Sequence, residues 1–173
     1  MTIALDATYS LGDALSGVGL YSHEMLFGLA AAHPEVRFDF CYRPHRFFRS
    51  WRAAGTKRFG EQPAAGVPWN RGAELFHGLN QRLPRIPLRR AITTFHDLFV
   101  LTGEYSTPEF RARFARQARD AAARSAAVIA VSAFTRSQVV SLLGVEASRV
   151  HVVHHGIRQL NLPAVAREPI ILN

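Results

Sequence analysis

The chain has 173 residues with 48% hydrophobic content, enough for one domain that buries about 68–70% of its unfolded surface. Its single cysteine, Cys41, excludes a disulfide framework and a thiolate metal cluster. The formal charge of +8 favours anionic partners such as nucleotides, phosphates, nucleic acid or an acidic membrane surface.

The first residues, MTIALDATYS, lack the basic region and the long apolar run of a secretory signal. The longest uncharged apolar stretch, Ser125–Thr135, is shorter than the roughly 20 residues that cross a bilayer. We therefore expect a cytoplasmic protein.

Strands and helices alternate along the first half of the chain. Thr2–Ala7 is predicted to form a buried strand, and Val18–Ala32 has apolar residues at helical spacing. Val36–Tyr42 alternates apolar residues as a strand does. Two short strands are expected next, at Ala73–Gly78 and Ala91–Phe95.

A long helix is predicted to follow. Thr107 suits its N-cap, Pro108 suits its first turn, and Glu109 favours the positive end of the helix dipole. The last predicted elements are a fully apolar strand, a helix that ends at Gly144 and a final strand: Ala126–Val131, Ser132–Leu143 and Val150–Val153.

This pattern gives six strands, whose continuous apolar runs indicate a parallel sheet covered on both faces. We predict an α/β fold, an open doubly wound, Rossmann-like sheet with the strand order 3-2-1-4-5-6. Ligands of such sheets bind beyond the carboxyl ends of the strands, where the strand order reverses. The predicted order sets the loop after the first strand against the loop after the fourth, Ala91–Phe95.

The loop after the first strand contains SGVG, Ser16–Gly19, which opens the first helix. Backbone N–H groups at a helix start favour phosphate, and glycine permits close approach of a ligand. Taken alone, the two glycines are better explained as a tight turn. Ser22 stands where a dinucleotide-binding fingerprint requires a third glycine, so NAD binding is disfavoured.

The loop after the fourth strand begins with His96 and Asp97. His96 is a candidate general acid or base, metal ligand or hydroxyl-binding group; the alternative is a loop histidine packed against its own backbone. Asp97 either orients the imidazole or caps the following turn.

His77 and the pair His154–His155 also follow predicted strands at this edge. No carboxylate-rich pattern accompanies them, so we favour a site without metal. Ser132 is sufficiently explained as a helix cap. The chain has neither the G-x-S-x-G elbow of a hydrolase nor the phosphate loop of a P-loop NTPase.

A basic and aromatic stretch, YRPHRFFRSWR, runs from Tyr42 to Arg52. This composition suits either a membrane interface or stacking on nucleic-acid bases. A second basic stretch, Arg111–Arg119, is adequately explained as the solvated face of a helix.

Taken in order, five segments resemble the N-terminal half of a retaining glycosyltransferase of family 4, with the GT-B fold: SGVGLYSHEMLFGLA, AELFHG, TTFHDLFVL, VIAVSAFTRSQVV and VHVVHHGI. The resemblance implies two Rossmann-like domains that face each other across a cleft. It divides the chain into residues 1–162, an N-terminal acceptor-side domain, and 163–173, a linker and the first strand of a C-terminal donor-binding domain that the chain lacks.

The resemblance also implies roles for individual residues. His96 matches the histidine that contacts the donor sugar near the reaction centre, where it would act as a hydrogen-bonding group and not as a classical base. Leu20 stands where an arginine is common, and His155 where an asparagine is often seen. The implied substrate-binding residues are Gly17, Val18, Gly19, Asp97, Ser132 and His155.

The implied function is transfer of a sugar from a nucleotide sugar to a glycan or lipid-linked acceptor with retention, in polysaccharide biosynthesis and without a metal or other cofactor. We expect no activity from the chain alone and contact with the anionic inner face of a membrane through the Tyr42–Arg52 stretch. We expect Pro169–Asn173 either to be disordered or to mediate self-association, and we expect no nucleic-acid partner. The alternatives are a basic nucleic-acid-binding module and an NAD-dependent Rossmann enzyme.

Overall fold

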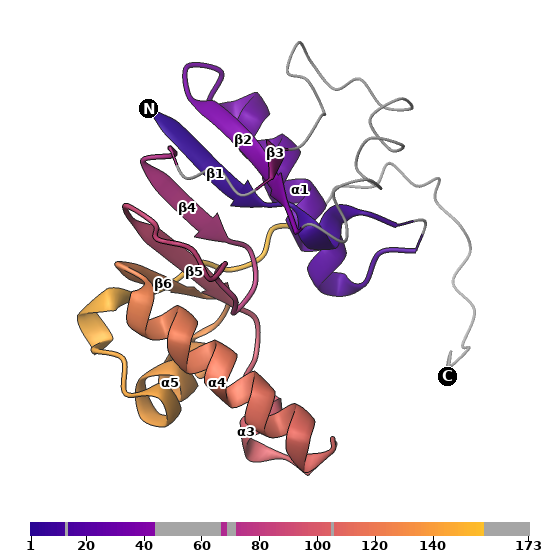
Figure 1. The fold of residues 1–173 in the computed structure, drawn as a ribbon. Helices are drawn as coiled ribbons and strands as arrows, with labels where there is room; N and C mark the ends of the chain where they lie inside the picture. The colour runs from indigo at the N-terminus through magenta and orange to yellow at the C-terminus, as the bar shows by residue number, and fades with distance from the viewer. Residues whose placement is uncertain (13, 44–66, 69–71, 105, 158–173) are drawn as a thin grey trace, which may run out of the picture.

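The computed structural model describes residues 1–12, 14–43, 67–68, 72–104 and 106–157 (Figure 1). Three expectations from the sequence lie outside these residues: most of the Tyr42–Arg52 stretch, the segment 163–173 and the Pro169–Asn173 tail. Within the described residues, no helix is both long enough and apolar enough to span a bilayer.

A parallel sheet forms the centre of the described structure (Figure 1). Its seven strands lie in the order β3-β2-β1-β4-β5-β6-β7, and all of their pairings are parallel. The predicted Rossmann-like α/β fold is therefore confirmed. The strands are β1 (Thr2–Asp6), β2 (Arg37–Tyr42), β3 (Val67–Pro68), β4 (Leu75–Gly78), β5 (Ala91–Phe95), β6 (Ala127–Ala130) and β7 (Val150–Val152).

The predicted position of the first strand beside the strand that carries His96 is wrong. Leu5 of β1 pairs with Phe40 of β2 on one side and with His77 of β4 on the other. β5 lies one strand further away, because β4 is a central strand buried on both faces and the two-residue β3 forms the edge instead. The strand order still reverses at β1, between β1 and β4.

The helices begin where the sequence offers capping side chains. The Oγ atoms of Ser16, Thr107 and Ser132 accept hydrogen bonds from the backbone N–H groups of the first turns of α1, α4 and α5. Gly144 ends α5 in the left-handed conformation with φ of 67°, as expected of a C-cap glycine. The helices are η1 (Thr8–Ser10), α1 (Gly17–Ala32), α3 (Phe99–Thr102), α4 (Pro108–Arg124), α5 (Ala133–Leu143) and η2 (Ala147–Arg149).

The core lies on both faces of the sheet. Leu5 and Phe38 pack against Leu26 of α1 in one buried cluster, and Phe95 packs with Phe114 of α4 in another. The crossover from β1 to β2 proceeds along the sheet in one direction, and those from β5 to β6 and from β6 to β7 proceed in the other. Because each crossover is right-handed, their helices lie on opposite faces. α1 therefore covers one face, and α4 and α5 cover the other. The loop between β4 and β5 contains no helix; its Leu83 and Leu88 pack on the α4 side, in a third cluster.

Candidate functional site

Three aromatic rings meet beyond the carboxyl ends of the strands. Tyr21 comes from α1, His96 from the loop after β5, and His155 from the segment after β7. The ring centroid of Tyr21 lies 4.7 Å from that of His96 and 4.8 Å from that of His155, and the two imidazoles are 5.3 Å apart. We call these three residues the ring cluster. The structure thus brings together His96, His155 and the helix that SGVG opens.

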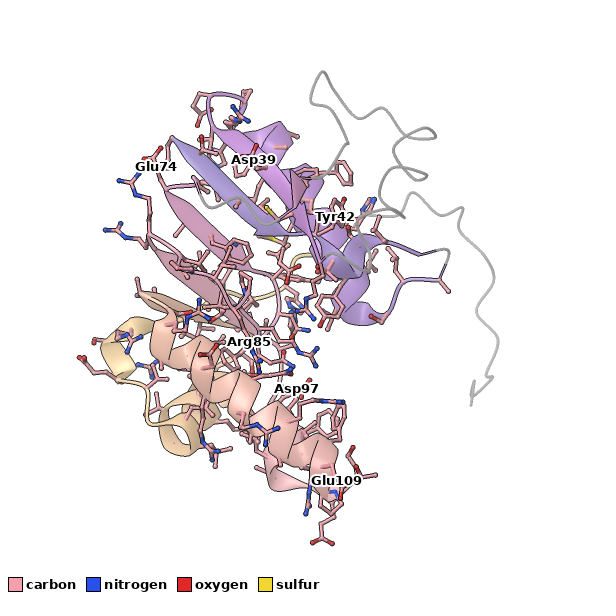
Figure 2. All side chains as sticks on the ribbon, in the orientation of Figure 1. Asp39, Tyr42, Glu74, Arg85, Asp97 and Glu109 are labelled. Atoms are coloured by element: carbon pink, nitrogen blue, oxygen red, sulfur yellow. The ribbon has the colours of Figure 1, made fainter. Side chains whose placement is uncertain are left out.

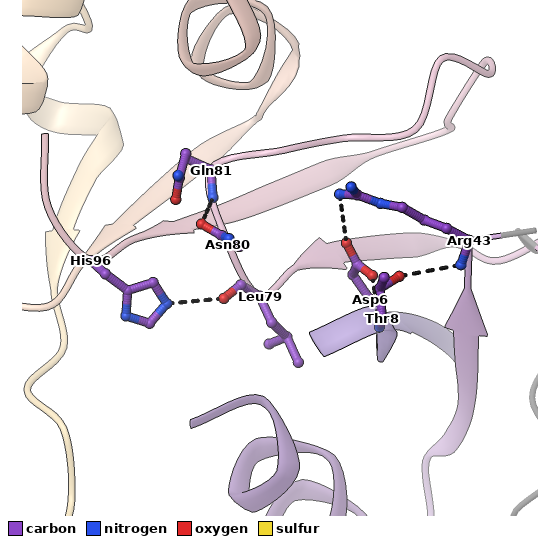
Figure 3. A network of polar contacts seen from close by, with 7 residues as sticks. All are labelled: Asp6, Thr8, Arg43, Leu79, Asn80, Gln81 and His96. Carbon is purple, nitrogen blue, oxygen red and sulfur yellow. Dashed lines mark hydrogen bonds and ion pairs between the residues drawn. The ribbon is translucent and has the colours of Figure 1, made fainter. Parts of the chain in front are cut away.

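The His96 ring is held by a backbone carbonyl. Its Nε2 lies 3.0 Å from the carbonyl oxygen of Leu79, as Figure 3 shows. A carbonyl oxygen only accepts, so Nε2 carries the proton, and the Nδ1 of the neutral ring is left as a hydrogen-bond acceptor. Burial lowers the pKa of His96, and the nearby His155 lowers it further, whereas the Leu79 carbonyl and Asp97 act in the opposite direction. The imidazole is therefore neutral at pH 7.

A series of hydrogen bonds among buried side chains connects the ring cluster to the sheet. The Tyr21 hydroxyl lies 3.3 Å from Oγ1 of Thr94, and that atom lies 2.9 Å from Nε2 of His77. His77 is buried, and its burial lowers the pKa of the imidazole to about 4. His77 lies near the end of β4, at the sheet edge where the sequence placed it. It is not one of the ring-cluster residues, and it positions Tyr21 through Thr94.

Asp97 caps the turn that follows it. Its Oδ1 accepts a hydrogen bond of 3.3 Å from the backbone N–H of Phe99, which starts the short helix α3. Asp97 is exposed, and its carboxylate acts on the His96 imidazole only through charge. Of the two alternatives from the sequence, the structure favours the cap.

The two glycines of SGVG differ in their surroundings. A Cβ atom on Gly19 would lie 2.8 Å from the carbonyl oxygen of Tyr9, so a side chain at this position clashes with backbone. A Cβ atom on Gly17 would meet nothing within 4 Å, and Gly17 is exposed. Gly19 thus allows α1 to pack on η1, whereas Gly17 leaves the start of the helix open. Val18, between them, is half-buried.

Ser132 connects α5 to the backbone of His96. Its Oγ accepts a hydrogen bond of 3.0 Å from the N–H of Thr135, as an N-cap does. The Oγ1 of Thr135 in turn donates to the carbonyl oxygen of His96 at 3.2 Å. Ser132 therefore fixes the helix start against which the backbone of His96 rests.

Asp6 is buried at the carboxyl end of β1, close to this edge. Its Oδ1 accepts from the N–H of Thr8 at 3.1 Å, and its Oδ2 lies 3.7 Å from a guanidinium nitrogen of Arg43 (Figure 3). Burial raises the pKa of Asp6, and the positive charge of Arg43 partly opposes that rise. Asp6 therefore ties the end of β1 to the residue that follows β2.

Sequence reasoning missed both Asp6 and Tyr21. The acidic residue at the end of an apolar strand was a usable signal for Asp6. Tyr21 falls within the helical spacing of apolar residues in Val18–Ala32, and nothing in the sequence distinguishes it there. Within the described ranges, no group of three or more His, Cys, Asp or Glu side chains is arranged to hold a metal ion.

The sheet edge, the ring cluster and the open helix start define a Rossmann-like domain with a polar site at its strand ends. The model of Glycosyltransferase Family 4 matches residues 15–158, so the chain belongs to that family. It is 36% identical over 77 residues to the O-antigen chain mannosyltransferase B of Escherichia coli. The matched part covers 44% of this chain and 20% of that protein.

Proposed function

We propose that the protein containing this domain transfers a sugar from a nucleotide-sugar donor to a glycan or glycolipid acceptor, with retention of the anomeric configuration. The observation that carries the proposal is the neutral, fixed imidazole of His96 in contact with Tyr21 of α1, the helix whose first turn is open at Gly17. Membership of Glycosyltransferase Family 4 supports sugar transfer as the class of reaction.

His96 would bind the donor sugar by hydrogen bonding. With Nε2 committed to the Leu79 carbonyl, its Nδ1 can accept a hydrogen bond from a sugar hydroxyl. Because the ring is held before the substrate arrives, little reorganisation is needed when the sugar binds. Tyr21 and His155 would form the wall against which the sugar lies.

The start of α1 would bind the donor phosphates. The first N–H groups of a helix have no partner within the helix and lie at the positive end of its dipole, so they stabilise phosphate charge. The N–H of Gly19 already donates to Ser16 Oγ, which leaves those of Gly17 and Val18 for a ligand. Asp97 and Ser132 would contribute through the loop and the helix start that they fix.

The phosphate site proposed here consists of backbone N–H groups and needs no metal. We therefore propose a metal-independent transfer. The name of the Escherichia coli relative makes nucleotide-linked mannose the first donor to examine.

The proposal is tested by incubating the protein that contains these residues with a panel of nucleotide sugars and saccharide acceptors. We expect transfer from one donor, at the same rate in excess EDTA. If transfer of the sugar, or hydrolysis of the nucleotide sugar, stops in excess EDTA, the metal-independent mechanism is contradicted. If no sugar is transferred from any donor, the proposed function is contradicted.

A further inference from the structure

A second concave site is lined by residues outside the ring cluster. The groove has a volume of about 940 Å³ and lies between α4 and the loop that joins β4 to β5, on the face opposite α1. Figure 2 shows Arg85 of this loop beside α4. We call it the arginine groove. Its charged and amide side chains are Arg43, Arg82, Arg85, Arg113, Arg116, Arg124, Gln117 and Asp120.

The arginine groove is strongly positive. Six arginines and one aspartate line it, which gives a formal charge of +5. In the described part of the chain, only two of these arginines have ion pairs: Arg43 with Asp6 at 3.7 Å, and Arg124 with Asp120 at 3.1 Å. The remaining four have no ion pair among the described residues, although the charge of Arg82 acts on Asp6 and the Arg113 guanidinium lies over the Phe110 ring, 5.2 Å from its centroid. Such a concentration of positive charge attracts an anionic ligand.

Two polar atoms of the groove are buried and lack a hydrogen-bond partner within the described residues. One is Nε of Arg82, which is a donor, and the other is Oε1 of Gln117, which is an acceptor. Buried polar atoms are normally paired, so each would gain a partner if its side chain turned towards a ligand in the groove. A ligand that paired both atoms would offer a hydrogen-bond acceptor to Arg82 Nε and a donor, such as a hydroxyl group, to Gln117 Oε1.

The shape of the groove suits a small ligand better than it suits the flat surface of a membrane. Its volume falls within the range of about 300–1,000 Å³ typical of small-molecule sites. Leu83 and Leu88 of its lining pack on Phe76 of the sheet, so one wall is fixed by the core. The groove extends from Arg43, just after β2, to Arg124, the last residue of α4. A membrane surface would need a flat or protruding basic patch, and this one is concave.

We propose that the arginine groove binds the phosphate or pyrophosphate group of a phosphorylated saccharide, with Arg82, Arg85 and Arg116 on the phosphate and Gln117 accepting a sugar hydroxyl. The identification of this saccharide as the acceptor rests on the proposed function. Its phosphate either ends the molecule or links it to a lipid, and the chemistry in the groove is the same in both cases.

Binding is measured by titration calorimetry with three probes: inorganic pyrophosphate, a hexose 1-phosphate and the uncharged hexose. We expect both phosphates to bind and the hexose not to bind. Replacing two exposed arginines, Arg85→Gln with Arg116→Gln, should raise the Kd for either phosphate by about tenfold or more, because charge-assisted hydrogen bonds are lost. Arg119→Gln is the matched control on α4, since Arg119 is exposed and does not line the groove.

Gln117→Leu tests the part of the site that binds hydroxyl groups. It should weaken binding of the hexose 1-phosphate several-fold and weaken pyrophosphate binding less, since pyrophosphate has no sugar hydroxyl to donate. Equal weakening of both probes would overturn the assignment of Gln117. Unchanged thermal unfolding of each variant shows that any loss is local.

The source of the phosphate is distinguished with phosphatidylcholine vesicles that carry a saccharide linked to a polyprenyl pyrophosphate. Binding to these vesicles, lost in the double arginine variant, indicates a lipid-linked ligand; binding of the hexose 1-phosphate alone indicates a free one. Binding of the protein to phosphatidylglycerol vesicles or to single-stranded DNA, without binding of either small phosphate, overturns the proposal in favour of a membrane or nucleic acid.

The binding result does not depend on sugar transfer. If the proposed function holds, the double arginine variant should raise the KM for a phosphorylated acceptor and retain kcat. If no transfer is found but the phosphates bind in the groove, only the identification of the ligand as an acceptor fails. If transfer proceeds and neither phosphate binds, the arginine groove proposal fails alone.

Discussion

The chemistry expected of His96 depends on the Leu79 carbonyl, which fixes the tautomer of the ring. His96→Ala removes the hydrogen-bonding group and should lower kcat by about 10²–10³, as loss of a group that stabilises developing charge does. Turnover is measured in the protein that contains this domain. His151→Ala is the control, since His151 is exposed on β7. Unchanged turnover in a folded His96→Ala variant would reduce His96 to a loop histidine that packs on backbone.

His77 makes the stability of the domain depend on pH. Its pKa of about 4 in the folded protein lies below the ordinary 6.5, so the unfolded chain binds the proton more readily. The free energy of unfolding should therefore fall as pH falls from 6.5 to about 4, by about 3 kcal/mol at most.

The change is measured by urea unfolding at several pH values. His77→Gln is the comparison variant, because its side-chain amide can still reach Thr94 and does not titrate. Asp6, whose pKa is raised by burial, contributes equally to both proteins and cancels in the difference. Parallel pH profiles for the two proteins would show that His77 is not the titrating group.

These residues show what sequence could and could not reveal about the site. His96 was predictable because a polar residue directly after a buried strand lies at the ligand-binding edge of a parallel sheet. The depressed pKa of His77 was not predictable, since it depends on burial under neighbours distant in the chain. Tyr21 was missed because half-buried and fully buried helical positions have the same spacing.

Two glycine substitutions at the start of α1 distinguish a role in ligand binding from a role in packing. Gly19→Ala should destabilise the domain by about 1–3 kcal/mol, because its Cβ would lie 2.8 Å from the Tyr9 carbonyl oxygen. Gly17→Ala should change stability by less than about 0.5 kcal/mol, since its Cβ meets nothing. If the helix start binds the donor phosphates, Gly17→Ala should nevertheless raise the KM for the nucleotide sugar. An unchanged KM would restrict both glycines to a structural role.

The start of α5 separates capping from ligand binding. Ser132→Ala should cost about 1 kcal/mol of unfolding free energy, because the Thr135 N–H loses its acceptor. Ser132→Asp keeps a capping oxygen and should restore stability. Thermal unfolding of both variants checks this. A stable Ser132→Asp variant with normal activity would limit Ser132 to the cap; a stable variant with reduced activity would place the hydroxyl near substrate.

The helices were easier to predict than the strand order. Caps and breakers such as Thr107, Ser132 and Gly144 act through bonds within a few residues, so the local sequence contains the information. The neighbour of a strand depends on the whole sheet. The short edge strand Val67–Pro68 gave no periodic signal, and without it β4 was placed at the edge.

The edge beyond the strand ends combines a polar site with exposed apolar side chains. Leu20 at the start of α1, Phe99 in α3 and Phe134 in α5 are 51%, 51% and 71% exposed. Apolar side chains at the edge of a site are typical of surfaces that contact a substrate or a further domain. The proposed transfer needs a donor and an acceptor together at this edge, with the donor sugar at His96.

The anomeric configuration of the product reports on both the proposed retention and the role of His96. The protein that contains this domain is supplied with a nucleotide sugar of known anomeric configuration and a saccharide acceptor, and the new linkage is assigned by NMR from the one-bond coupling between its anomeric carbon and proton. We predict transfer with the configuration of the donor preserved, and loss of the product signal in the His96→Ala variant. An inverted linkage, or equal product from the variant, would contradict it.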